Sequence, residues 1–311
     1  MRAMRIQVAI VVSVLAGALA AGEIAAAPVK GQQNGALTPE QVRELVERLR
    51  VNQHRNDTAL AEYERQERRY AWKHDEQKTI TEDKTYRVVP TGTGTLKLLL
   101  EEKGRRVTDE TYKKELRELE RVLQNALNPQ ESRQRQAVEK WERRSRERRE
   151  MVDAVPQAFL VSWAGREPAP GTGRTCVKLL FEPNPKFTPD SRNEEIFPHV
   201  RATVWIDETE AQAVRVEAEI TRDIGVFGGV FGKIYKGGTF LMEQARVADG
   251  VWLPSRYEFD FDGRRFVFPF SVNETTEITA FRRVGPPAEA LALVRREIQN
   301  GARPAAANPS K

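Results

Sequence analysis

The sequence predicts an α+β fold in which helices cover the opening of a curved antiparallel sheet, an unclosed β-barrel. Two observations carry this prediction. Long segments alternate apolar and charged residues with a period of two, the pattern of strands with one buried face, and short turns separate successive strands. Other segments repeat apolar residues at helical spacing. Hydrophobic residues make up 40% of the 311 residues, which is enough for a core and argues against a disordered chain.

The N-terminal segment is organised like a secretory signal peptide. Arg2 and Arg5 precede an apolar stretch over residues 8–21, and small residues follow it. This stretch is shorter than the about 20 residues that a membrane-spanning helix needs. We therefore expect export to the periplasm with cleavage of residues 1–27, then a linker over residues 28–37 and a soluble mature protein.

A docked helix is predicted over residues 38–61. Thr38, Pro39 and Gln41 supply an N-cap, a proline at the first helical position and the second partner of a capping box. Apolar residues then recur at i, i+3, i+4 and i+7, which makes one face that must pack against another element. These residues are Val42, Leu45, Val46 and Leu49.

Two segments predict most of the sheet. Residues 63–102 alternate with a period of two and are rich in Thr, Tyr, Val and Ile, so we expect three antiparallel strands there. The segment from residue 157 to residue 283 alternates in the same way and extends the sheet. Within it, Asp262-Gly263 predicts a two-residue hairpin turn, so that residues 251–272 fold back on themselves.

A charged helical hairpin is predicted as an insertion over residues 109–153. Its first arm is capped by Asp109 and stopped at Asn128-Pro129. Its second arm, residues 129–153, has few apolar residues, so we expect it to project into solvent. The apolar stripe of the first arm consists of Tyr112, Leu116, Leu119, Leu123 and Leu127.

The C-terminal part of the sequence predicts one more helix, over residues 285–301. Its apolar residues have helical spacing, and Gly301 supplies a stop. The proline- and alanine-rich tail over residues 302–311 is expected to be disordered. Residues 38–284 are then expected to form one half-barrel domain that contains the helical hairpin.

The residues of common catalytic and metal sites are scarce. The single cysteine, Cys176, excludes an intrachain disulfide and is expected to be a small buried hydrophobe. His54, His74 and His199 have no spacing that suggests a shared metal. The basic residues concentrate in the second arm of the hairpin, and export argues against a nucleic-acid partner. We therefore expect no enzyme activity, no cofactor and no metal.

Residues 200–256 carry a family resemblance. They hold a strand ending in WID, a turn, a second strand and a later strand that opens GVWLP. In this order and spacing they resemble the LolA/LolB-like outer-membrane lipoprotein-sorting proteins, and the resemblance extends over most of the chain, from Leu37 to Arg283. It implies an unclosed antiparallel β-barrel with helices closing the opening, and a lipid-like ligand inside it.

The glycine-rich segment over residues 225–238 allows two interpretations. Its glycines let the backbone bend sharply and leave apolar side chains available, so it could form a flap that admits an acyl chain or touches a membrane surface. The structural interpretation, which we favour, is a kinked core strand with bulges. The residues expected to bind the ligand are Phe227, Phe231, Ile234, Trp205, Trp252 and Phe259.

The expected function is that of a monomeric periplasmic carrier, which holds a lipid or a lipidated polypeptide in an apolar concavity and touches a membrane surface only transiently. The alternative is an envelope sensor or scaffold module that binds a partner protein through the charged hairpin, whose guanidinium groups could also bind lipid phosphates. A solvated helix face explains the same charges without a partner. The arginines concerned are Arg143, Arg144, Arg146, Arg148 and Arg149.

Overall fold

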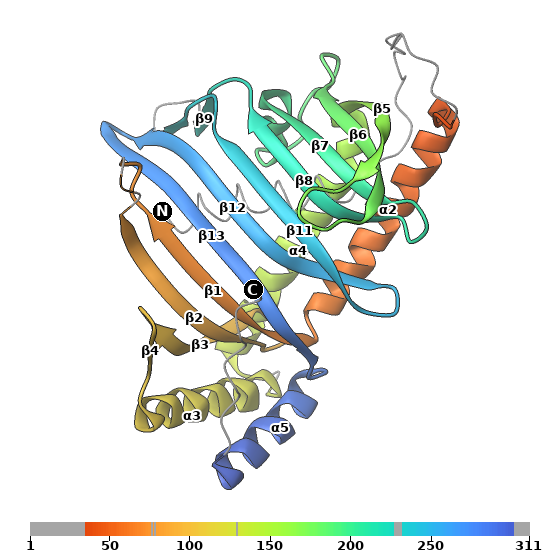
Figure 1. The fold of residues 1–311 in the computed structure, drawn as a ribbon. Coiled ribbons are helices and arrows are strands. Elements are labelled where there is room, and N and C mark those ends of the chain that lie inside the picture. The colour runs from red at the N-terminus through yellow and green to blue at the C-terminus, as the bar shows by residue number, and fades with distance from the viewer. Residues whose placement is uncertain (1–34, 76, 78, 129, 227–231, 302–311) are drawn as a thin grey trace. The chain divides into compact units, whose positions relative to one another are not determined.

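The computed structural model describes residues 35–75, 77, 79–128, 130–226 and 232–301 (Figure 1). These residues form an antiparallel sheet of 13 strands with the hydrogen-bonded order β4-β3-β2-β1-β13-β12-β11-β8-β7-β6-β5, and β10 pairs with both β12 and β9. β4 and β5 are the two end strands of this order and do not pair with each other, so the sheet of the described residues is not closed. The predicted α+β class with an unclosed antiparallel sheet is confirmed.

The elements follow the predicted succession of helix, strands, helices, strands and helix. Within the described residues, the helices are α2 (Pro39–Leu60), α3 (Asp109–Ala126), α4 (Ser132–Ala158), the 3-10 helix η1 (Glu194–His199) and α5 (Pro287–Asn300). The strands are β1 (Tyr63–Trp72), β2 (Ile80–Pro90), β3 (Thr95–Glu102), β4 (Arg105–Arg106), β5 (Phe159–Pro168), β6 (Thr175–Pro183), β7 (Val200–Asp207), β8 (Gln212–Ile220), β9 (Ile224–Val226), β10 (Gly232–Ile234), β11 (Thr239–Ala248), β12 (Val251–Arg265) and β13 (Phe268–Arg283).

The chain divides into two compact units. The first unit consists of Met1–Asn56 and Arg146–Asn273, and the second consists of Asp57–Ser145 and Glu274–Lys311. The first unit therefore contains β5 to β12, most of α2 and the C-terminal part of α4. The second unit contains β1 to β4, α3 and α5, and residues of β13 belong to both. Each unit has an apolar core of its own.

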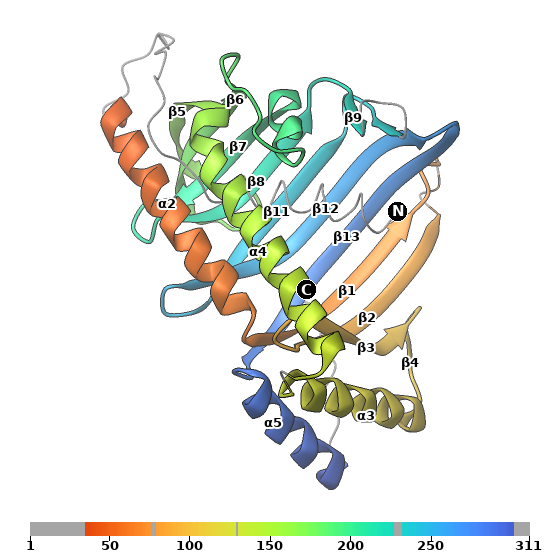
Figure 2. The ribbon, with the colours of Figure 1, turned by 180° about the vertical axis from the view of Figure 1, so that it is seen from behind.

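The core of the first unit lies between two helices and one face of the strands, which we call the core face. Figure 2 shows α2 and the C-terminal part of α4 on the same side of β5 to β8. Burying one large apolar side chain contributes about 1.5–3 kcal/mol, so this layer stabilises the unit through many such side chains. The helices contribute Val42, Leu45, Val46 and Leu49 from α2, and Met151, Val152, Val155 and Ala158 from α4.

Polar contacts fix both ends of α2. At its start, the Thr38 amide donates to Oε1 of Gln41 over 2.8 Å and the Gln41 amide donates to Oγ1 of Thr38 over 3.3 Å, which confirms the predicted capping box. Near its end, buried Asn56 donates to Oε1 of Gln212 over 2.8 Å and accepts from the backbone amide of Trp252 over 3.1 Å. These amide bonds attach the last turns of α2 to β8 and β12.

The hairpin predicted over residues 251–272 is present, but its predicted turn at Asp262-Gly263 is wrong. β12 continues through both residues, and the two turn residues are Phe266 and Val267. The Asp-Gly pair favours a tight turn in general, because glycine adopts the positive φ that such turns need. Here Gly263 does not have a positive φ.

Close packing explains the glycine at position 263 instead. Gly263 pairs with Ile234 of β10. A Cβ atom at this position would lie inside van der Waals contact of the Lys233 carbonyl oxygen and 2.6 Å from Cζ of Phe270. A glycine in a strand commonly marks such a close approach. The residue therefore serves the contact between β10, β12 and the Phe270 ring.

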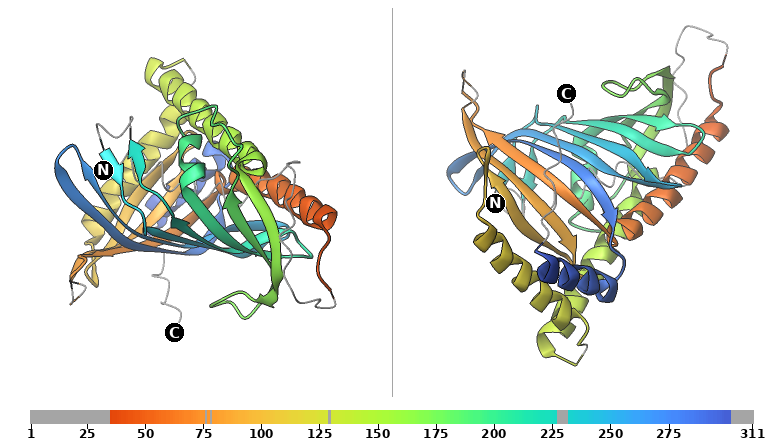
Figure 3. Two further views of the ribbon diagram at one scale, coloured as in Figure 1. Left: turned by 90° about the horizontal axis from the view of Figure 1, so that it is seen from above. Right: turned by 60° about the horizontal axis from the view of Figure 1, so that its bottom comes forward.

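The core of the second unit is smaller. α3 and α5 lie side by side, as the right view of Figure 3 shows, and share one apolar cluster with β2 and β3. Gly301 follows α5 with φ of 64°, which confirms the predicted helix stop. The buried members of the cluster are Val89, Leu98, Leu100, Tyr112, Leu116, Leu119, Leu123, Val284, Ala290, Leu291 and Val294.

The predicted helical hairpin differs from the observed helices in three details. Thr108, and not Asp109, is the N-cap of α3, and its side chain accepts from the Thr111 amide. Leu127 was expected in the apolar stripe but is exposed, because α3 ends one residue earlier. α4 was expected to project into solvent, yet its last turns are buried in the core of the first unit.

The described residues at the two ends of the glycine-rich segment belong to two short strands, β9 and β10, and residues 227–231 between them lie outside the described residues. β9 and β10 pair with each other, with Gly232 opposite Val226 and Ile234 opposite Ile224. Both isoleucines are buried in the core of the first unit. Phe227 and Phe231, which were expected to bind the ligand, lie outside the described residues.

Candidate functional site

Five aromatic side chains lie on the core face of three neighbouring strands in the first unit. They are Phe240 of β11, Tyr257, Phe259 and Phe261 of β12, and Phe270 of β13. Antiparallel pairing sets Phe240 opposite Phe259, with ring centroids 4.9 Å apart in an edge-on arrangement. Phe261 and Phe270 are also edge-on, at 6.4 Å. Each such pair adds about 0.5–1.5 kcal/mol beyond its buried area. We call these five residues the aromatic face.

The aromatic face is buried in its middle and reached by solvent at two rings. Phe240, Phe259 and Phe261 are buried. Tyr257 and Phe270 pack against the same cluster but are only half-buried. These two rings are therefore where an apolar molecule would first meet the face.

The short strands β9 and β10 adjoin one end of the aromatic face. β10 pairs with the last residues of β12, close to Phe270. Gly238 follows β10, and a Cβ atom there would lie 2.6 Å from Cβ of Phe261 and 3.0 Å from Cδ1 of Ile220. Any larger residue at position 238 would therefore push against the aromatic face.

The structure does not bring the predicted ligand-binding residues together. Phe259 is part of the aromatic face, and Ile234 lies in the same apolar cluster. Trp205 and Trp252 belong to a separate cluster on the opposite face of the sheet. Side chains alternate between faces along a strand, and Trp205 stands between Val204 and Ile206, both of which face the core. One concavity cannot be lined by both groups.

Trp205 and Trp252 are satisfied by neighbours on their own face. The indole nitrogen of Trp205 donates to Glu167 over 3.0 Å, and that of Trp252 donates to Glu210 over 2.8 Å. Lys178 lies 5.3 Å from the centroid of the Trp205 ring, in a cation–π contact. Each ring packs in a small structural cluster.

The arginines of α4 lie mostly on its exposed surface. Trp141, in the same stretch of helix, is 39% exposed. Exposed arginines on a helix contribute little to stability, so their placement fits a solvated face or a surface for another molecule. Arg143, Arg144, Arg146 and Arg149 are exposed and Arg148 is half-buried.

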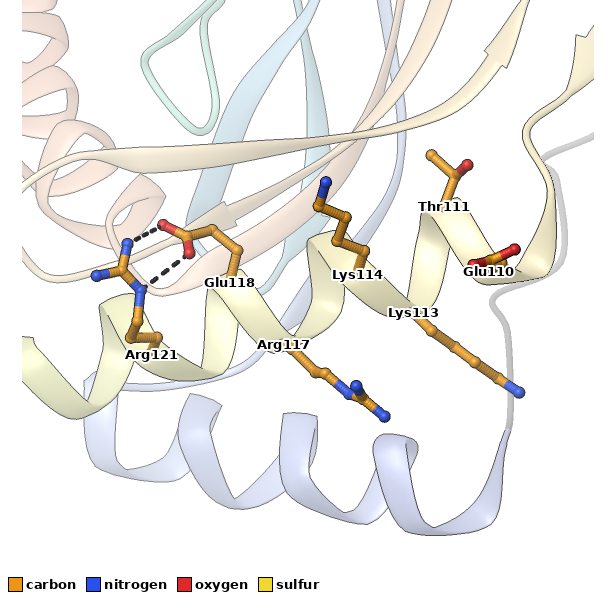
Figure 4. Close-up of a pocket in the computed structure, with 7 residues that line it drawn as sticks. All are labelled: Glu110, Thr111, Lys113, Lys114, Arg117, Glu118 and Arg121. Carbon is orange, nitrogen blue, oxygen red and sulfur yellow. Dashed lines mark hydrogen bonds and ion pairs between the residues drawn. The ribbon is translucent and has the colours of Figure 1, made fainter.

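A charged hollow lies along the exposed face of α3, in the second unit (Figure 4). Its volume is about 650 Å³. Arg121 forms a two-bond ion pair with Glu118, with distances of 2.9 and 2.5 Å. The charged residues that line the hollow recur three and four residues apart, so helical spacing in the sequence could have revealed that they share one face of α3. The residues that line it are Glu110, Thr111, Lys113, Lys114, Arg117, Glu118 and Arg121, with four basic and two acidic groups.

Arg87 is the centre of a buried charge network in the second unit. It donates to Glu64 of β1 over 2.8 and 3.0 Å, to Glu297 of α5 over 2.8 and 2.9 Å, and to the Tyr112 hydroxyl over 2.8 Å. Burial alone would lower the pKa of Arg87, but the two carboxylates outweigh it and raise that pKa above its usual value. Arg282 also binds Glu64 over 2.7 Å, so two guanidinium groups face two carboxylates, and the network acts as a clamp for α3 and α5.

Cys176 and His54 are held in local structural contacts. Burial, together with the Asp207 carboxylate, raises the pKa of Cys176 to about 11, so the thiol stays protonated at neutral pH. His54 pairs with Asp153 over 3.0 Å, which ties α2 to α4. Among the described residues, no three metal-ligating side chains come together.

Comparison with protein-family models, with curated proteins and with solved structures finds no match in any of the three. The likeness to lipoprotein-sorting proteins therefore depends on the residues of the sequence alone. Within the described parts of the chain, no helix has both the length and the apolar character of a membrane span.

Proposed function

We propose that this chain is an exported, non-catalytic binding protein of the periplasm, and that it holds an acyl chain of a lipid or of a lipidated polypeptide against the aromatic face. In this proposal the sheet curves as a half-barrel, and helices cover its opening. The observation that supports it best is the row of five aromatic rings on adjacent strands, with Tyr257 and Phe270 accessible to solvent.

Buried area alone would supply the affinity. An alkyl chain that loses roughly 300 Å² of apolar surface gains about 7 kcal/mol, before the cost of fixing its position is subtracted. Aromatic rings suit this task because they are large and have few rotatable bonds, so little entropy is lost when a ligand packs on them. Neither a metal nor a nucleophile is needed for such binding.

Ligand binding is tested with the full chain purified from an exporting bacterial host. Native mass spectrometry should detect a co-purifying lipid, and a fluorescent fatty acid should bind and be displaced by an unlabelled one. If no lipid co-purifies and no fatty acid binds, the proposal is wrong.

Two substitutions locate the binding face. Tyr257→Ala removes a half-buried ring from the aromatic face and should weaken fatty-acid binding about tenfold, because most of the ring's contact area is lost. Leu241→Ala is the matched control, since Leu241 is half-buried on the opposite face of the neighbouring strand β11. Equal effects of the two substitutions would show that binding is not on the aromatic face.

The charged surface of α3 supports a second candidate, a module that binds an acidic partner protein. The four basic groups of the hollow exceed its two acidic groups, which favours a negatively charged partner. Deleting residues 109–153 would not test this, because Tyr112 and the leucines of α3 belong to the core of the second unit. Lys113→Glu with Arg117→Glu keeps that core and should abolish capture of such a partner, whereas Arg296→Glu on α5 should leave capture unchanged.

A further inference from the structure

The tip of the β12–β13 hairpin exposes three consecutive apolar residues. Phe266 is 46% exposed, Val267 is 80% exposed and Phe268 is 72% exposed. Single exposed apolar residues are common on soluble proteins, whereas an uninterrupted exposed run of this kind is costly unless it has a function. Two-residue turns usually contain Gly, Asn or Asp, none of which is present here.

The backbone of the turn carries a second unusual feature. Phe266 has φ of 53°, in the left-handed region that glycine normally occupies at the first position of such a turn. A bulky residue is rare in this conformation because its side chain crowds the backbone. Glycine would remove both the strain and the exposed ring. Strained residues of this kind concentrate at functional positions.

Basic residues surround this apolar tip. Pairing of β10 with β12 sets Lys233 opposite Arg264, and Arg265 is the last residue of β12. Asp223 forms an ion pair with Lys233 over 2.7 Å. Asp262 accepts a hydrogen bond from Ser271 over 2.5 Å. The neighbouring basic residues are Lys233, Lys236, Arg264 and Arg265, and the acidic ones are Asp223, Asp260 and Asp262, so four positive charges minus three negative ones leave a net charge of +1.

The spacing of apolar and basic residues matches the depth of a lipid headgroup layer. A strand rises about 3.3 Å per residue and the chain reverses at the turn, so the turn lies roughly 3–7 Å beyond the two arginines along the hairpin, and its apolar side chains reach further. Apolar groups of surface-bound proteins enter lipid to a depth of about 5–10 Å, with Lys and Arg at the level of the headgroups. Tyr235, exposed beside Lys236, has the ring and hydroxyl that favour the same layer.

We propose that the hairpin tip, residues 264–268, docks the protein on a lipid surface that contains anionic headgroups. Phe266, Val267 and Phe268 enter the lipid, and Arg264, Arg265 and the nearby lysines contact the headgroup phosphates. This proposal goes beyond acyl-chain binding and does not depend on it, because the docking residues are outside the aromatic face.

Vesicle sedimentation with the full chain tests the docking. The two lipid compositions are phosphatidylcholine alone and an equal mixture of phosphatidylcholine and phosphatidylglycerol. We expect tighter binding to the mixture than to phosphatidylcholine alone. Binding should weaken as salt is added, because at 0.1 M salt the attraction between the basic residues and the anionic headgroups is screened over a Debye length of about 10 Å. Val267→Ser with Phe268→Ser should weaken sedimentation about tenfold or more, because the exposed apolar area of the tip is lost. Val51→Ser, on α2, is the control and should bind as the unchanged protein does, since Val51 is also an exposed apolar residue.

A tryptophan placed at the tip reports docking at this position when its signal is taken as a difference, because the chain already contains five tryptophans. The emission of Phe268→Trp minus that of the unchanged protein should shift to shorter wavelength with the mixed vesicles and be quenched by brominated lipid. The same reporter in Val51→Trp should not respond. No response at position 268, or sedimentation of the double serine variant equal to that of the unchanged protein, would overturn the proposal.

Two further results separate docking from other uses of the tip. A dimer that dissociates in the double serine variant, without any change in vesicle binding, would assign the tip to contacts between copies and overturn the lipid proposal. Fatty-acid displacement should be the same in the double serine variant as in the unchanged protein, because the aromatic face is intact. Loss of vesicle binding with unchanged fatty-acid binding therefore supports docking independently of the carrier function.

Discussion

The two units attach their helices in different ways. In the first unit, α2 and α4 pack on the sheet through an extended apolar layer, and the polar contacts of α2 add to it at the ends and on the outer side of the helix. In the second unit, α3 and α5 share a smaller apolar cluster, and buried Arg87 connects them to β1 and β2. The first arrangement gains stability from area, and the second adds directional contacts to a core that offers less area.

Apolar packing and a buried charge network differ in how strictly they fix the position of a helix. Apolar packing tolerates small shifts, because many side-chain arrangements of similar volume have similar energies. A guanidinium group that binds two carboxylates and a hydroxyl accepts only one geometry. We therefore interpret the Arg87 network as the element that fixes where α3 and α5 lie in the second unit.

The largest expected effect comes from breaking this network. Arg87→Met leaves the buried Glu297 carboxylate without its guanidinium partner and leaves Glu64 with Arg282 alone, and it should lower the free energy of unfolding of the second unit by about 3–5 kcal/mol. Hydrogen exchange of backbone amides, resolved along the chain, measures the loss in each unit separately. Amides of β5 to β8 in the first unit should keep their protection.

Two companion variants identify the cause of the loss. Arg68→Met removes an exposed ion pair with Asp83 and should cost less than about 1 kcal/mol. Adding Glu64→Gln and Glu297→Gln to Arg87→Met should restore part of the stability, because no uncompensated charge is then buried. If Arg87→Met costs no more than Arg68→Met, the network does not clamp the helices.

A smaller loss is expected from Gly263→Ala in the first unit. The added methyl group would collide with the Lys233 carbonyl oxygen and with the ring of Phe270, and overpacking of this kind costs about 1–3 kcal/mol. Urea unfolding measures the change. Gly173→Ala, at a glycine with open space around its Cβ position but a positive φ, separates the steric cost from the backbone cost. A neutral Gly263→Ala would contradict the close-packing explanation of the glycine.

Gly263 also shows where sequence reasoning about the fold failed. Short-range patterns predicted α2 with its capping box and stripe, because both are set by residues within a few turns of one another. The Asp262-Gly263 pair was predicted to form a turn from the same kind of short-range pattern. The approach of β10 and Phe270, which decides the role of Gly263, depends on pairing that no local pattern contains.

The candidate site was less predictable than the fold. Aromatic residues were selected from the sequence by type, and period-two alternation did not show which face of each strand would be the core face, so Trp205 and Trp252 were grouped with Phe259. The exposed tip was missed because the turn was expected four residues earlier. Arg87 resembled any other strand arginine in the sequence, since its partners come from β1, α3 and α5.

Acid should affect the two units in different pH ranges. Burial, aided by Arg222 and opposed by Asp223, lowers the pKa of His199 in the first unit below its usual 6.5. As pH falls below 6.5, the unfolded chain binds a proton that the folded unit binds less tightly, so the first unit loses stability.

Burial would raise the pKa of Glu67 in the second unit, but Arg65 and Lys97 outweigh it and lower that pKa below 4.5. The contribution of Glu67 is complete above 4.5 and is lost as pH falls through the lowered pKa.

Each of these groups contributes a slope of at most about 1.4 kcal/mol per pH unit, because only one proton is involved. Unit-resolved hydrogen exchange corrected for intrinsic rates measures the slopes. His199→Asn should flatten the slope of the first unit just below pH 6.5. Glu67→Gln should flatten that of the second unit below pH 4.5. If the pH dependence of a unit's stability is unchanged by the substitution made in that unit, the dependence comes from another titratable group.

The smallest effects are expected at the helix caps, where the two units should behave alike. Thr38→Ala in the first unit removes the acceptor of the Gln41 amide, and Thr108→Ala in the second removes the acceptor of the Thr111 amide. Both exposed caps satisfy one backbone amide, so each substitution should cost about 1 kcal/mol by urea unfolding. Similar costs at the caps, together with a large cost at Arg87, would assign the contrast between the units to their cores. A cap in the second unit that costs as much as Arg87→Met would mean that α3 is held mainly by its own first turn, and that the buried network has a smaller part in positioning it.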